Sequence, residues 1–94
     1  MNLQTRINKK LQKLNAMEAL TEEQRAERSL LLLFNHGESP EIILDILGFM
    51  AASNHKTIAQ ARLNKDTELE EEVSAAINAV YNVYLLVQPN RKAA

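Results

Sequence analysis

Catalysis or metal binding by this chain would depend first on its two histidines, His36 and His55. Both fall at the ends of expected helices, where an imidazole commonly hydrogen-bonds the free carbonyl groups of the last turn. His36 and Glu38 together are too few ligands for a metal site. The chain has no cysteine, and it has no Ser-His-Asp order, His-Glu-x-x-His motif or glycine-rich phosphate loop. The sequence therefore predicts a protein without enzyme activity, cofactor or metal ion.

Four basic residues near the N-terminus, Arg6, Lys9, Lys10 and Lys13, have a spacing that could bind an anionic surface. At about 100° per residue they lie on one side of a helix, beside its apolar stripe. Such a face can bind phosphates, lie on an anionic membrane or dock into an acidic groove of a partner protein. It can equally be a solvated face, or pair within the chain with the five acids of residues 66–72. A membrane is the least favoured target, because this helix has no tryptophan or phenylalanine to anchor it.

The hydrophobic residues, 46% of the chain, are concentrated in two segments. Residues 30–34 are consecutive apolar residues that cover every side of a helix, and residues 41–52 are almost as apolar. The polar or small positions of the second segment are Ala51 and a narrow strip made of Glu41, Asp45, Gly48 and Ala52. Each helix of an isolated four-helix bundle leaves one face in water, so these segments indicate burial against another chain.

We therefore expect a dimer or higher homo-oligomer whose interface contains apolar residues of both segments. The expected interface residues are Leu31, Leu32, Ile43, Leu44 and Leu47. The alternative is a monomer in which the third helix lies at the centre.

Capping patterns locate the helices that carry these residues. Capping boxes are expected at Thr21–Gln24 and Thr67–Glu70. Asn2 and Ser39 are expected N-caps, and the serine is followed by a proline that favours the first helical position. Gly37 is expected to end the second helix in the left-handed conformation.

The chain is expected to form a single all-α domain over residues 1–94, with four or five helices in a bundle-like arrangement. Two glycines and two prolines are too few turn formers for a many-stranded β protein. The expected helices cover residues 2–19, 22–35, 40–53, 55–64 and 68–88. A continuous helix over 40–64 is the alternative to the break near residues 53–55, which are poor helix formers without glycine or proline. Pro89 is expected to end the last helix, with residues 90–94 fraying.

The net charge of −1 gives no strong overall attraction to nucleic acid or anionic lipid. The longest fully apolar run, residues 30–34, is far shorter than a membrane span, and the N-terminus has no apolar signal segment. The lack of cysteine fits a reducing compartment. We therefore expect a cytoplasmic protein that does not bind membranes.

A DNA-binding helix-turn-helix could occupy residues 40–64, with Gly48 in the turn. The position four before the glycine is normally small, but it is Leu44. The positions six and nine after the glycine are normally apolar, but they are Asn54 and Thr57. These three misfits argue against the motif.

The sequence favours a non-catalytic regulatory or adaptor protein that binds a protein partner as a helical homo-oligomer. One alternative is a DNA-binding transcriptional regulator that uses the basic first helix. Another is a protein that sequesters a small anionic, nucleotide-like ligand between subunits. That ligand would contact the same lysines and a tyrosine, Tyr81 or Tyr84, although such a tyrosine pair more often lies at the margin of a core.

Overall fold

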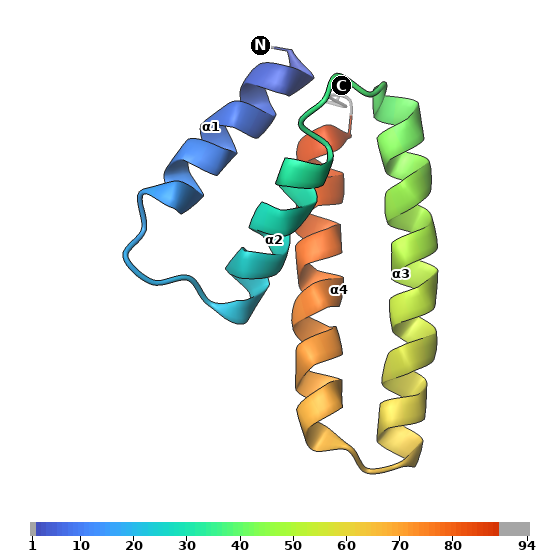
Figure 1. Cartoon of the computed structure of the whole chain (residues 1–94). Coiled ribbons are helices and arrows are strands. Elements are labelled where there is room, and N and C mark those ends of the chain that lie inside the picture. The colour runs from blue at the N-terminus through green and yellow to red at the C-terminus, as the bar shows by residue number, and fades with distance from the viewer. Residues whose placement is uncertain (1, 89–94) are drawn as a thin grey trace, which may run out of the picture.

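The computed structural model describes residues 2–88, and in this range the chain forms four α-helices and no strand (Figure 1). The helices are α1 (Leu3–Asn15), α2 (Glu22–Leu33), α3 (Pro40–Leu63) and α4 (Thr67–Val87). Over these described residues, no helix is both long and apolar enough to span a bilayer. The all-helical prediction is confirmed. The expected stop at Pro89 and the fraying over 90–94 lie outside the described residues.

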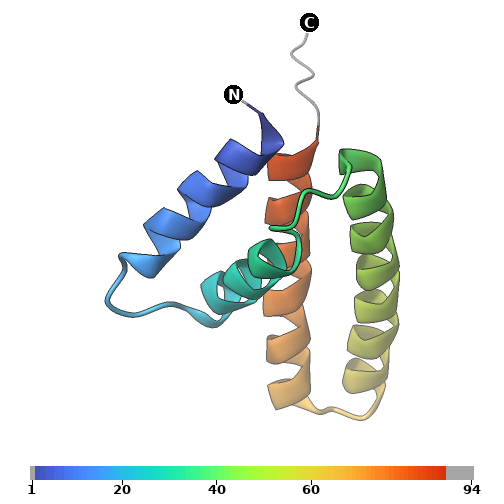
Figure 2. The same cartoon turned by 45° about the horizontal axis from the view of Figure 1, so that its top comes forward.

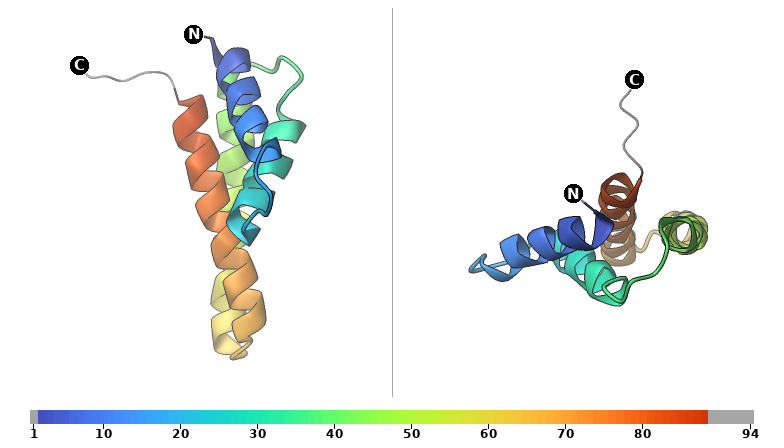
Figure 3. Two further views of the ribbon diagram at one scale, coloured as in Figure 1. Left: turned by 90° about the vertical axis from the view of Figure 1, so that its left-hand side faces the viewer. Right: turned by 90° about the horizontal axis from the view of Figure 1, so that it is seen from above.

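α4 is the central element of the arrangement. It packs against α1, α2 and α3, whereas α3 packs mainly on α4. Seen from above, α1 and α3 lie at opposite ends of the molecule, with α2 and α4 between them (Figure 3). Figure 2 shows the same order, with α3 beside α4 on the side away from α1. α2 and α3 therefore share α4 as a neighbour without packing extensively on each other.

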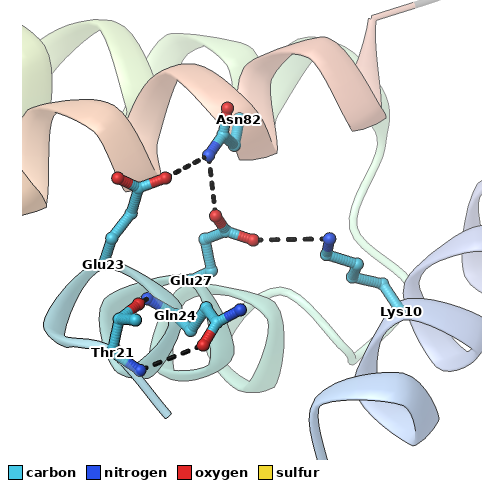
Figure 4. A network of polar contacts seen from close by, with 6 residues as sticks. All are labelled: Lys10, Thr21, Glu23, Gln24, Glu27 and Asn82. Carbon is cyan, nitrogen blue, oxygen red and sulfur yellow. Dashed lines mark hydrogen bonds and ion pairs between the residues drawn. The ribbon is translucent and has the colours of Figure 1, made fainter.

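Three of the four predicted N-caps are confirmed by hydrogen bonds of their side chains. The side chains of Asn2 and Ser39 each accept a hydrogen bond from a backbone amide of the first turn, at 2.8 and 3.3 Å. The Thr21 hydroxyl accepts from the Gln24 amide at 3.1 Å, and the Gln24 side chain accepts from the Thr21 amide at 3.0 Å (Figure 4). This reciprocal pair is the predicted capping box.

The capping box predicted at Thr67–Glu70 is wrong. The N-cap of α4 is Asp66, whose Oδ1 accepts from the Leu69 amide at 3.1 Å. An aspartate carboxylate also interacts favourably with the positive end of the helix dipole, which a threonine hydroxyl does not. The Glu70 carboxylate instead forms an ion pair with Arg62 of α3, with 2.9 Å between Arg62 Nε and Glu70 Oε2.

The helix break predicted near residues 53–55 is wrong, because α3 continues from Pro40 to Leu63. Ile58 and Ala61 lie after the expected break and are buried, and α3 packs on α4. Their burial outweighs the low helix propensity of residues 53–55, which costs about 0.5 kcal/mol per residue. The continuous helix also has no turn at Gly48, so no helix-turn-helix forms here.

α1 and α2 end earlier than predicted, at Asn15 and Leu33. Leu14 is the last buried residue of α1 and Met17 is exposed, so a further turn has nothing to pack against. Gly37 has the predicted left-handed φ, +84°, but it lies in the loop before α3, beyond the cap of α2.

The turn between α3 and α4 is a Schellman motif built without glycine. Lys65 has a left-handed φ of +55°. Its amide donates to the Arg62 carbonyl at 3.2 Å, and the Asp66 amide donates to the Ala61 carbonyl at 2.8 Å. These bonds reverse the chain so that α3 and α4 run antiparallel.

One buried cluster joins all four helices. Its members are Ile7, Leu11, Leu14, Leu31, Phe34, Ile43, Leu47, Val80, Val83 and Val87. Three of the five predicted interface residues belong to it, since Leu31, Ile43 and Leu47 are 0%, 0% and 1% exposed. One chain buries them because α4 presents valines to both α2 and α3, so these three residues require no second copy and are not surface residues. Of the other two, Leu32 is exposed and Leu44 is half-buried against the cluster.

Candidate functional site

The structure brings the four predicted basic residues to one groove between α1 and the C-terminal end of α4. The groove, about 540 Å³ in volume, is lined by Arg6, Lys9, Lys10, Gln12, Lys13 and Leu86, and we call it the basic groove. The predicted common face on α1 is therefore observed. Its floor is apolar, because Leu86 and the aliphatic parts of the basic side chains form it.

Arg6 has a structural partner inside the molecule. Its Nη1 donates to the Leu86 carbonyl oxygen at 2.7 Å. Leu86 lies in the last turn of α4, where carbonyl groups have no partner within the helix and the helix dipole is negative. Arg6 therefore caps α4 from a neighbouring helix, and this bond positions α1.

Lys10 also has a partner within the chain. Its Nζ lies 3.7 Å from Oε1 of Glu27, a residue of α2 that is only 5% exposed. Asn82 of α4 donates from Nδ2 to Glu27 at 2.7 Å and to Glu23 at 2.9 Å (Figure 4). This network joins α1, α2 and α4, and in it Lys10 pairs with α2 rather than with the acidic start of α4.

Glu27 was not predicted as a site residue, although its spacing along α2 indicates that it faces inward. Glu27 lies four residues before Leu31 and seven before Phe34, so at helical spacing it shares their inward face. A charged residue on a buried stripe requires a partner, and Lys10 and Asn82 provide it.

Lys9 and Lys13 are the members of the basic groove left for an external ligand. Both are exposed, and neither has an ion-pair partner within residues 2–88. They are four residues apart on α1, so their side chains are neighbours on the helix surface. The groove therefore presents two available positive charges beside an apolar floor.

A second groove lies between α2 and α3, with α4 as its floor, and has a volume of about 510 Å³. We call it the apolar groove. Its lining contains no charged side chain and consists of Ala26, Ser29, Leu30, Leu33, Met50, Ser53, Asn54, Ala76 and Val80. Large apolar side chains in and beside it are exposed, since Leu33 of the lining is 52% and Phe49 of α3 78% exposed.

The histidines and tyrosines lie apart from the basic groove. His36 and His55 are exposed, and Tyr81 and Tyr84 are not among the residues that line it. In the described part of the chain, no group of three or more His, Asp or Glu side chains is placed to hold a metal ion.

Comparison of the chain with protein-family models, curated proteins and solved structures finds no match.

Proposed function

We propose that this chain is a cytoplasmic, non-catalytic regulatory or adaptor protein that binds a protein partner and acts as a helical homo-oligomer. The observation that carries the proposal is the basic groove, in which Lys9 and Lys13 are exposed beside the apolar floor at Leu86. An acidic amphipathic helix matches this chemistry, because its apolar residues fit the floor while its carboxylates meet the lysines. The protein then works by occlusion or scaffolding.

Two observations favour a protein partner over the alternative ligands. A nucleotide-like ligand commonly stacks its base on an aromatic side chain, and no aromatic residue lines the basic groove. DNA binding commonly uses several phosphate contacts, whereas Arg6 and Lys10 are already engaged within the chain.

The proposal is tested by affinity capture from a nuclease-treated lysate, with the wild-type chain and Lys13→Glu as baits. Lys65→Glu is the matched control, because Lys65 is exposed and lies in the turn at the other end of α4. We expect an acidic protein that wild type and Lys65→Glu retain and that Lys13→Glu loses.

Three results contradict the proposal. One is that no protein is retained specifically, and another is that Lys13→Glu retains the same protein as wild type. The third is retention that occurs only from a lysate without nuclease treatment, together with retardation of duplex DNA that weakens steeply as salt rises. That result would favour the DNA-binding alternative.

A further inference from the structure

We infer that the apolar groove is covered by α3 of a second copy of this chain, and that two copies pack α3 against α3 in antiparallel orientation about a two-fold axis. This inference rests on the self-association in the proposed function and names the surface that performs it. It replaces the interface predicted at Leu31, Ile43 and Leu47, which one chain buries.

α3 has large apolar side chains on two faces, and within residues 2–88 only one of these faces has a neighbour. The first face contains the buried residues and packs on α4. The second contains the large apolar residues Ile42 and Phe49 and the polar Ser53, which lie within about 40° of one another at helical spacing. All three are exposed, and Ser53 lines the apolar groove. The second face and the groove therefore form one continuous surface without a partner in the chain.

The charges of this surface favour a copy of the same chain. A two-fold axis places identical surfaces against each other, so a patch with charge of one sign would repel itself. The lining of the apolar groove is uncharged. Asp45 and Lys56 border the second face on its other side, both exposed, with no ion-pair partner in the described part of the chain.

The positions of these two charges fix the register of the pairing. Asp45 and Lys56 are eleven residues apart, about three turns, and so lie on the same side of α3. When two α3 helices pack antiparallel with the axis between Met50 and Ala51, Asp45 of each copy lies opposite Lys56 of the other. Two opposite-charge pairs then flank the apolar contact, and Phe49 lies near the axis.

The surface is large enough for a specific dimer. α3 has 24 residues and α2 has 12, so they extend about 36 and 18 Å. With helices about 10 Å wide, the two faces beside the groove present on the order of 500 Å² on each copy. Two copies together bury on the order of 1,000 Å², which is about the minimum area for a biological interface and below the roughly 1,200–2,000 Å² of stable complexes.

The test is the molar mass of the purified full chain by light scattering, as a function of concentration. We expect twice the 10.6 kDa chain mass for wild type. Phe49→Glu is expected to give the mass of one chain, and because Phe49 is exposed this variant keeps its fold. Tyr81→Glu is the matched control. It also changes an exposed aromatic residue, but one outside the lining of the groove, and it is expected to remain dimeric.

Charge exchange tests the register. Asp45→Lys and Lys56→Asp are each expected to weaken dimerisation about tenfold at low salt, since each replaces two attractive pairs with two repulsive ones. The double exchange is expected to restore it.

A single-chain mass for wild type at concentrations on the order of 1 mM overturns the inference. A dimer that Phe49→Glu leaves intact, or a double exchange that does not recover, also overturns it. The measurement uses no partner protein, so a failed capture experiment leaves this inference standing. A dimer that forms through another surface overturns this inference without overturning the proposed function.

Discussion

Glu27 is charged and buried, and no other charged residue within 2–88 is buried. Its contacts show how single side chains orient the helices. Its carboxylate is shared between Lys10 of α1 and Asn82 of α4. Taking a carboxylate out of water is costly unless charge and hydrogen bonds replace the water. The network therefore favours one orientation of α1 and α4 on α2, which apolar contacts alone specify less sharply.

Asn82→Ala is predicted to lower the free energy of unfolding by about 1–2 kcal/mol, because the Glu27 and Glu23 carboxylates lose their common donor and then repel each other. Asn78→Ala is the control, since Asn78 is exposed one turn earlier on α4 and receives the same gain in helix propensity. Urea unfolding of both variants measures the difference. Equal stabilities would mean that water replaces the Asn82 amide at no cost.

Lys65→Gly is predicted to stabilise the chain by about 1 kcal/mol. Lys65 has a left-handed φ of +55°. This conformation is strained by about 1 kcal/mol in a residue with a β-carbon and is unstrained in glycine. Asn64→Gly is the comparison, because Asn64 has φ −88° and gains nothing from the change. Thermal unfolding should rank Lys65→Gly above wild type and Asn64→Gly below it, and the reverse order would contradict a left-handed turn.

At the scale of elements, three of the four N-caps were predictable from the sequence, whereas the ends of α1 and α2 and the continuity of α3 were not. An N-cap depends on the few residues that follow it, so Thr21 and Ser39 could be identified from local sequence. The continuation of α3 past residues 53–55 depends on burial of Ile58 against α4, which lies later in the chain. Local propensity does not contain that contact, and the predicted break was wrong for this reason.

Gly48→Ala is predicted to stabilise α3 by about 1 kcal/mol. Gly48 lies in the middle of the helix, and a β-carbon there meets no atom within 4 Å. The substitution therefore removes the entropic cost of glycine without a clash. Gly37→Ala is the informative control, because the space around Gly37 is equally open but its φ is +84°. We expect Gly37→Ala to lower the free energy of unfolding, measured in urea, by about 1 kcal/mol or more. A lower free energy of unfolding for Gly48→Ala would contradict a regular helix at that position.

At the scale of the whole molecule, the sequence indicated more apolar surface than one chain can bury. The predicted oligomer interface, however, included residues that the chain itself buries. Composition and periodicity showed that α2 and α3 are apolar on several sides. They could not show that α4 lies between these helices and covers Leu31, Ile43 and Leu47. The basic groove was better predicted, because its four residues share a face of one helix, although the internal partners of Arg6 and Lys10 come from α4 and α2.

The two-copy arrangement predicts that thermal stability depends on protein concentration, because association stabilises the folded chain by mass action. For a dimer that unfolds to two separate chains, each tenfold increase in concentration adds about 0.7 kcal/mol per chain. For a domain of this size that raises Tm by about 3–5 °C. Calorimetry over a hundredfold range of concentration should therefore give a rising Tm for wild type and a constant, lower Tm for Phe49→Glu. A constant wild-type Tm would mean that the apolar groove stays open in solution, since a covered groove must contribute to stability.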